Sequence, residues 1–162
     1  MGNSQESIYI ETTIPSLYTG RSSPHIVEAA RQHLTRNWWD NERHDYLCVT
    51  SQTVIDECSR GEMEMAQKRL AMLSGLPLIK LVEPVGDIAK ELLSRKIIPT
   101  KAADDAIHIA VASVHSIDYI LTWNCRHLAN PKIWWRVNDV VSNYGFLPSV
   151  ICTPEDLVGD DN

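Results

Sequence analysis

The sequence predicts an α/β protein, a three-layer α/β/α sandwich whose central sheet is mainly parallel. Two observations support this fold class. Short runs of β-branched or aromatic residues alternate along the chain with longer segments whose apolar residues recur at helical spacing. Strands that alternate with helices form crossover units, and crossover units give a parallel sheet that is covered by helices on both faces.

Five strands are expected, at residues 7–10, 46–50, 76–82, 119–123 and 150–152. A strongly apolar stretch, 106–112, is expected to form a buried helix. Four further helices are predicted by apolar residues at helical spacing. These sets are Ile26, Ala29, Ala30, Leu34 and Trp38, opened by Pro24; Met63, Ala66, Leu70 and Leu73; Val85, Ile88, Ala89 and Leu92; and Ile133, Val137, Val140 and Tyr144.

The chain of 162 residues has the length of one ordinary domain. No repeat, low-complexity tract or Pro/Gly/Ser-rich linker divides it, so residues 1–162 are expected to form a single domain. Its core is expected at about residues 8–153, with the first few residues and a C-terminal tail at about 159–162 loose.

The net charge of −6 argues against a uniformly basic, nucleic-acid-binding surface. It does not exclude nucleic acid, because acidic residues around bound cations count as negative in a sum that omits the cations. Four scattered cysteines form no C-x-x-C pair, and no signal segment or membrane-spanning apolar run is present. A reduced cytoplasmic protein with mostly buried thiols and no membrane association is expected.

Acidic and amide side chains follow the predicted strands, where ligand sites of parallel sheets lie. Glu11 follows the first strand, Glu57 comes shortly after the second, and Asn124 follows the strand at 119–123. Asp105 opens the apolar helix. Carboxylates gathered at one edge repel one another unless a cation lies among them, and Mg or Mn prefers such oxygen ligands. The pattern therefore predicts metal-assisted hydrolysis of a phosphodiester.

Four segments, in this order, resemble the PIN-domain family, which includes the VapC toxins, over about residues 8–153. They are Ile-Glu-Thr-Thr, Val-Ile-Asp-Glu, Ala-Asp-Asp-Ala-Ile-His-Ile-Ala and Ile-Leu-Thr-Trp-Asn-Cys-Arg-His. The resemblance implies an Mg- or Mn-dependent endoribonuclease acting on RNA, restrained by a cognate antitoxin protein and assembled as a homodimer. Glu11 stands where the family usually has aspartate, Glu57 matches its helix-borne glutamate, Asp105 matches its aspartate, and Asn124 occupies a place often filled by Asp or Asn.

These assignments make Glu11, Glu57, Asp105 and Asn124 the predicted catalytic residues, with Glu11, Glu57 and Asp105 holding the metal. Thr12, Asp104 and Thr122 are possible accessory residues.

Most of these residues also have a structural interpretation. Glu11, which precedes Thr12, Thr13 and Pro15, also suits a turn-forming role, and Glu57 suits a solvated helix face. Asp104 suits a helix cap or the positive end of its helix, and Thr122 and Asn124 suit the cap of the turn at 125–127. His108 is expected to be a core or interface histidine with its hydrogen bonds satisfied. The pairs Trp38-Trp39 and Trp134-Trp135 are expected in the core or in a dimer surface rather than as base-stacking platforms.

Two other kinds of function compete with the nuclease. A receiver domain or an aspartate-nucleophile phosphatase also uses acids at strand ends. A receiver domain needs its acidic pair after the first strand, but here the pair Asp104-Asp105 opens a helix. The phosphatase needs Asp at position 11, where this chain has Glu. The remaining alternative is a catalytically inactive PIN-like module that binds RNA or protein. The identity of the RNA is not predicted by these patterns.

Overall fold

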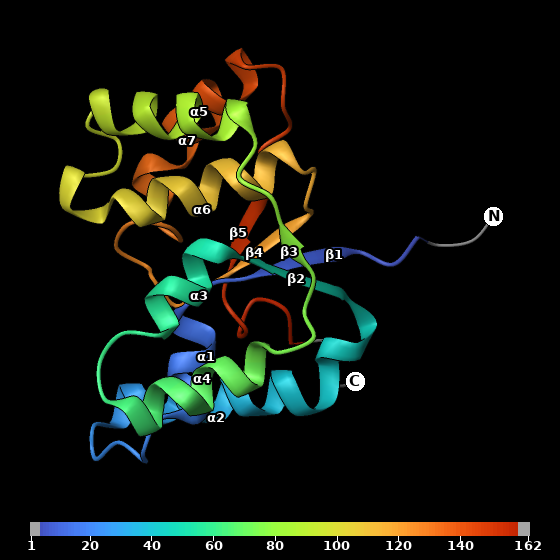
Figure 1. Ribbon diagram of the computed structural model, residues 1–162, viewed down its shortest axis with the longest axis vertical. Coiled ribbons are helices and arrows are strands. Elements are labelled where there is room, and N and C mark those ends of the chain that lie inside the picture. The colour runs from blue at the N-terminus through green and yellow to red at the C-terminus, as the bar shows by residue number, and fades with distance from the viewer. Residues whose placement is uncertain (1–3, 159–162) are drawn as a thin grey trace.

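The computed structural model describes residues 4–158, and its centre is a five-stranded sheet in the order β3-β2-β1-β4-β5 (Figure 1). Every pair of neighbouring strands is parallel, which confirms the predicted fold class. The strands are β1 (Ser7–Ile10), β2 (Leu47–Ser51), β3 (Leu78–Ile79), β4 (Tyr119–Leu121) and β5 (Val150–Cys152).

Helices cover both faces of the sheet. Figure 1 shows α5, α6 and α7 on one side of the strands and α1, α2 and α4 on the other. The α-helices are α1 (Thr13–Thr19), α2 (Ile26–Asn37), α3 (Gln52–Cys58), α4 (Met63–Leu73), α5 (Glu83–Ser94), α6 (Ala103–Val114) and α7 (Pro131–Asn143). Three short helical segments join them: η1 (Trp38–Glu42), η2 (Arg43–Asp45) and η3 (Thr100–Ala102).

Strand β1 lies in the middle of the sheet because it pairs with β2 on one side and with β4 on the other. Its residues Ile8, Tyr9 and Ile10 are fully buried. Since the side chains of a strand alternate between the two faces, a strand buried on both faces carries a continuous apolar run rather than an alternating one. The carboxyl end of β1 therefore lies in the middle of the edge that the carboxyl ends of the five strands form.

Helix α6 is the most deeply buried helix. Seven of its residues are buried, namely Ala106, His108, Ile109, Ala110, Val111, Ala112 and Ser113. It packs mainly against α5, whose apolar positions Val85, Ile88, Ala89 and Leu92 are all buried as the helical spacing predicts. A helix that is apolar almost all round is stable only where neighbours cover it, and α5 supplies most of that cover.

Several sequence expectations differ in detail from the structure. Helix α2 forms at the expected place, but its first residue, Ile26, is 85% exposed, and the helix buries Gln32 and Thr35 instead. Gln32 satisfies its amide by bonding to the backbone of Arg21 and Ser23. Periodicity thus identified the helix, whereas polar contacts decided which face turned inward. Strand β3 is also much shorter than the expected 76–82.

The two tryptophan pairs lie in different environments. Trp38 and Trp39 are buried in the core as expected. Trp134 and Trp135 are exposed on α7, so for the second pair core burial is excluded and the other expectation, a dimer surface, stays a prediction. The four cysteines are free thiols, of which Cys58 and Cys152 are buried and Cys125 is exposed. Among the described residues, no helix combines the length and hydrophobicity that a membrane span requires. The expected loose tail at 159–162 lies outside the described residues.

Burial in the central strands makes a direct stability prediction. Replacing Ile120, which is fully buried in β4, by alanine is expected to lower the free energy of unfolding by about 2–5 kcal/mol, since the substitution leaves a cavity in a packed core. Urea denaturation measures this difference. Ile26→Ala is the matched control, and its exposed side chain predicts a change within about 0.5 kcal/mol. Equal losses in both variants would contradict the assignment of the core.

Candidate metal centre

Glu11 follows β1 directly and lies at the carboxyl edge of the sheet. Its amide donates to the carbonyl of Leu121 in β4 at 3.2 Å, so the ladder of backbone bonds continues past the end of the strand. The side chain is only 3% exposed. Helix α1 starts two residues later, which turns the chain sharply and leaves the Glu11 carboxylate between β1 and β4.

One oxygen of Glu11 is surrounded by donors. Oε2 accepts the amide of Thr13 at 3.0 Å, the hydroxyl of Thr13 and the hydroxyl of Thr122 at 2.8 Å. The Thr13 hydroxyl in turn accepts the amide of Trp123 at 2.8 Å. Burying a carboxylate is costly unless it is hydrogen-bonded, and these three donors compensate for the water it has lost. Both the turn-forming role and the site role expected for this position are therefore present in one side chain.

Glu57 projects from α3 and is also held at one oxygen. Its Oε1 accepts the Thr12 hydroxyl at 2.8 Å and contacts His108 Nε2 at 2.6 Å. Burial raises the pKa of this carboxyl, but the hydrogen bond and charge of His108, followed by the Thr12 hydrogen bond, outweigh burial and lower the pKa overall. Glu57 is thus an ionised, half-buried group rather than part of a solvated helix face.

Asp105 lies in the first turn of α6, and its Oδ2 accepts the amide group of Asn124 at 3.1 Å. Burial is the main cause that raises its pKa to about 6, and the negative charges of Glu11 and Glu57 add to it. The charge of His108 and the Asn124 hydrogen bond oppose this rise without cancelling it. In the metal-free protein, Asp105 is therefore the carboxyl that resists ionisation.

The three carboxylates share one arrangement. Donors occupy Glu11 Oε2, Glu57 Oε1 and Asp105 Oδ2, whereas no donor from residues 4–158 contacts the second oxygen of any of them. Carboxylate oxygens with free lone pairs, close to like charges, are the ligands that hard divalent cations prefer. The donor set of this edge thus fits Mg²⁺ or Mn²⁺.

The closest group of candidate ligands contains Glu11, Asp105 and His108, whose ligand atoms all lie within 4.8 Å of one another. Glu57 is joined to this group through His108, and its role as a metal ligand stays a prediction. His108 is fully buried and hydrogen-bonded at both ring nitrogens, as expected of a satisfied histidine, but sequence reasoning missed its contact with the site. His108 follows Asp105 by three residues, which puts both side chains on one face of the helix. This spacing is the sequence signal from which the contact could have been predicted.

Asn124 and Thr122 combine a turn cap with contacts to the acids. Asn124 Oδ1 accepts the amide of His127 at 3.0 Å while its nitrogen donates to Asp105. Thr122 donates its hydroxyl to Glu11 and accepts the amide of Asn124 at 2.9 Å. The capping role and the site role proposed for this segment are therefore compatible. Asn124 uses its nitrogen for one and its oxygen for the other, and the Thr122 hydroxyl donates its hydrogen to Glu11 while its oxygen accepts the amide of Asn124.

Asp104 does not cap α6 as expected. The residue that precedes the helix is Ala102, and no side chain caps this end. Asp104 lies within the first turn and pairs with Arg60 at 3.6 Å, with both side chains partly exposed. Such an exposed pair contributes little to stability. The negative charge of Asp104 still interacts favourably with the positive, N-terminal end of the α6 dipole.

Two cationic side chains, Arg60 and Lys101, lie beside Glu57 and Asp105. A cavity of about 340 Å³ there is lined by Glu57, Arg60, Lys101, Ala102, Asp104, Asp105 and His127. His127 has a lowered pKa, because it is partly desolvated and lies near the positive charges of Arg126 and Lys101. The cationic side chains of Arg60 and Lys101 thus line the same cavity as the carboxylates of Glu57 and Asp105, an arrangement that suits a phosphate held against a cation.

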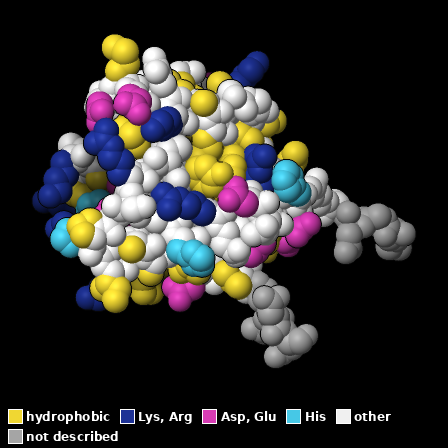
Figure 2. Space-filling view, turned by 90° about the horizontal axis from the view of Figure 1, so that it is seen from below, with side chains coloured by type: hydrophobic (Ala, Val, Ile, Leu, Met, Phe, Trp, Pro, Cys, Tyr) yellow, Lys and Arg dark blue, Asp and Glu magenta, His cyan; other side chains and the backbone are white. Residues whose placement is uncertain are grey.

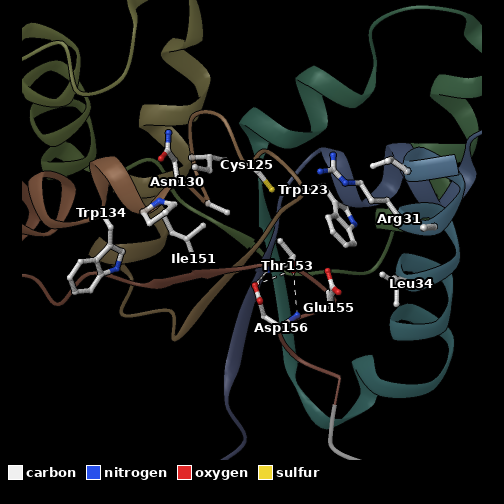
Figure 3. A pocket seen from close by; sticks show the side chains of 15 residues that line it. Arg31, Leu34, Trp123, Cys125, Asn130, Trp134, Ile151, Thr153, Glu155 and Asp156 are labelled. Carbon is white, nitrogen blue, oxygen red and sulfur yellow. Dashed lines mark hydrogen bonds between the residues drawn. The ribbon is translucent and has the colours of Figure 1, made fainter. Parts of the chain in front are cut away.

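A second cavity lies behind Trp123 and is of a different kind (Figure 3). It has a volume of about 690 Å³, runs between α2 and the start of α7, and is lined mainly by apolar side chains. Figure 3 shows Arg31 beside Trp123 and Asp156 bonded to Thr153. None of the three site carboxylates lines it, whereas Glu57 and Asp105 line the smaller cavity.

On one face of the molecule, charges of both signs are mixed rather than segregated. Figure 2 shows the face that carries α2 and α4, where Lys and Arg side chains are interspersed with Asp, Glu and His side chains and hydrophobic side chains gather in the central part. This agrees with the net charge of −6, which argues against a uniformly basic surface.

Comparison with known proteins gives a likeness in structure but none in sequence. Neither a protein-family model nor a curated protein sequence matches the chain. A crystal structure of VapBC2 from Rickettsia felis bound to a DNA fragment from its promoter is similar, with a TM-score of 0.53. The match has 15% sequence identity and covers 90% of this chain and 97% of that chain. The fold is PIN-like. At this identity the likeness establishes the fold, and the chemistry of the site has to be argued from its own residues.

The raised pKa of Asp105 predicts how stability depends on pH. Its pKa moves from an ordinary 3.8 to about 6 on folding, so between these values the folded protein binds more protons than the unfolded chain. The free energy of unfolding of the metal-free protein therefore falls as pH rises through this interval. Asp105→Asn is expected to be more stable than wild type at neutral pH, with the difference vanishing below pH 3.8.

Urea denaturation at a series of pH values in the presence of EDTA measures this difference. Asp87→Asn, at an exposed position of α5, is the matched control and is expected to show no such crossover. A variant at position 105 that is less stable than wild type at every pH would contradict the electrostatic account.

Proposed function

We propose that the protein is an Mg- or Mn-dependent endoribonuclease that hydrolyses RNA phosphodiester bonds. The observation that carries the proposal is the one-sided arrangement of Glu11, Glu57 and Asp105. Each carboxylate is held by donors at one oxygen and open at the other, at the edge of a parallel sheet where ligand sites lie. The similarity of fold to the VapBC2 structure adds support.

In this proposal Glu11, Glu57 and Asp105 hold the ion through their open oxygens. When bound, the ion supplies positive charge that stabilises the charge developing on the phosphoryl oxygens. Thr12 and Thr122 fix the orientation of Glu57 and Glu11, and Asn124 fixes that of Asp105. A site held in this way needs little rearrangement during the reaction, which is the main source of electrostatic catalysis.

The rim of the cavity accounts for binding of a polyanion by a protein of net charge −6. Arg60, Lys101 and His127 line the cavity beside Glu57 and Asp105. In this proposal Arg60 and Lys101 offer positive charge, and His127 offers a ring N–H, to the phosphates that flank the scissile bond. The positive charge is therefore local, and the affinity for RNA is expected to depend on the bound cation as well as on these side chains.

We further propose that the protein is the toxin of a type II toxin-antitoxin pair. The support is the similar VapBC2 structure, a complex bound to promoter DNA. A protein antitoxin would then cover the acidic cavity and withhold it from RNA. The proposed compartment is the cytoplasm, where such a pair meets its RNA.

A homodimer is part of the same proposal. Gel filtration with light scattering of the isolated chain is expected to give twice the mass of 18.3 kDa. Trp134→Ser, at an exposed tryptophan of α7, tests whether that helix takes part. A monomeric mass for the wild type at all concentrations would contradict the dimer.

Cleavage of a mixed, end-labelled RNA pool is the decisive activity test. The purified protein is expected to cut RNA with Mg²⁺ or Mn²⁺, to stop with EDTA, and to lose about a hundredfold or more of its rate as Asp105→Asn, since removing a charge-stabilising group costs this much. Asp87→Asn serves again as the control and should cut like the wild type.

Activity that survives both EDTA and Asp105→Asn would indicate a contaminant or a wrong assignment of the acids. A folded wild type that is inert with either metal but binds RNA or protein would favour the alternative, a catalytically inactive module. Asn124 favours this alternative in one respect, because its amide carries no charge and already bonds to Asp105 through its nitrogen and to the backbone of His127 through its oxygen.

A further inference from the structure

A buried chain of hydrogen bonds runs beneath the carboxylates. The Ser51 hydroxyl contacts the Tyr9 hydroxyl at 2.7 Å, the Tyr9 hydroxyl contacts His108 Nδ1 at 2.7 Å, and His108 Nε2 contacts Glu57 Oε1 at 2.6 Å. Ser51, Tyr9 and His108 are all fully buried. Ser51 immediately precedes α3, yet its hydroxyl makes no capping bond to that helix and is used in this chain instead.

The carboxylate at the end of this chain determines where the imidazole protons lie. An ionised Glu57 can only accept hydrogen bonds, so His108 Nε2 carries a proton and donates it. The other nitrogen, Nδ1, is directed to the Tyr9 hydroxyl. Neither nitrogen therefore presents a free lone pair to the space between the acids, and this holds whether the ring is neutral or charged.

His108 would otherwise be in position to bind a metal. Its ligand atom lies within 4.8 Å of those of Glu11 and Asp105. An imidazole together with two carboxylates is a ligand set that suits Zn²⁺, whereas oxygen ligands alone suit Mg²⁺ and Mn²⁺. The class of metal that the site prefers thus depends on whether this imidazole is kept out of the coordination shell.

We propose that Tyr9 and His108 are positioning residues that set metal selectivity. The chain from Ser51 through Tyr9 holds the imidazole against Glu57, which keeps the open face of the site made of oxygens only. The inference rests on the proposed function, since it concerns the ion that the nuclease uses. It adds to that function a reason why a histidine so close to the acids is not itself a ligand.

The test is isothermal titration of the purified, metal-free protein with Mn²⁺ and with Zn²⁺. Tyr9→Phe removes the hydroxyl that anchors Nδ1, so the ring is free to turn and offer a nitrogen. The ratio of Zn²⁺ to Mn²⁺ affinity is expected to rise by about tenfold or more, the size of effect that partners of metal ligands have on affinity. Tyr119→Phe, which removes a hydroxyl that bonds to Glu6 at the surface, is the matched control and should leave the ratio unchanged.

Two further variants separate selectivity from folding. Ser51→Ala breaks only the outer link of the chain and is expected to shift the ratio in the same direction by less. His108→Gln keeps an N–H donor for Glu57 but removes the imidazole, so adding Tyr9→Phe to it should no longer raise the ratio. In pulsed EPR of the Mn²⁺-loaded protein, coupling to a directly bound imidazole nitrogen should be absent in wild type and present in Tyr9→Phe.

The outcomes distinguish this inference from the proposed function. A wild type that binds neither Mg²⁺ nor Mn²⁺ would overturn the nuclease proposal. Metal binding with an affinity ratio unchanged in both Tyr9→Phe and Ser51→Ala would overturn the selectivity role alone. Nitrogen coupling already present in the wild type would also overturn it, because His108 would then be a ligand.

Discussion

The burial of Glu11 at the end of the central strand is the constraint on which the site depends. A carboxylate that is 3% exposed must be surrounded by donors, and these donors come from two segments. Thr13 supplies two because α1 begins immediately after Glu11, and Thr122 supplies the third because β4 pairs directly with β1. The strand order and the start of α1 are thus both required by one acidic side chain.

The same requirement for donors applies to Glu57 and Asp105, each of which accepts hydrogen bonds from residues 4–158 at one oxygen only. Hydroxyl, imidazole and amide donors contact one oxygen of each, and no donor from residues 4–158 contacts the opposite oxygen, so hydrogen bonds do not compensate the repulsion between the carboxylates there. Burial is the main cause of the raised pKa of Asp105, and that repulsion raises the pKa further. A cation that binds only the folded state would relieve it and stabilise the fold in proportion to its affinity. The metal-free site therefore lowers the stability of the fold, and a bound cation would offset this loss.

Much of the fold follows from local patterns, and the differences have identifiable physical causes. The four-residue run at Ser7–Ile10 and the apolar positions of α5 were predictable because a buried strand and an amphipathic helix leave strong periodic signals. Helix α1 was not expected, since Pro15 suggests a turn, but proline is tolerated in the first turn of a helix. The exposed Ile26 was mispredicted because Gln32 and Thr35 form buried hydrogen bonds that hydrophobic periodicity does not register.

The acids of the site were predictable for a different reason than their donors. Glu11, Glu57, Asp105 and Asn124 each follow a strand or open a helix, so parallel topology alone brings them to one edge. His108 was missed because its role depends on Tyr9 from β1 and Ser51 from β2, and only the sheet pairing makes these neighbours. The proposed ligands of the ion can thus be identified from local sequence patterns, whereas the groups that orient them become neighbours only in the tertiary structure. Substitutions in the orienting groups can therefore change the metal that the site accepts while every acidic residue stays in place.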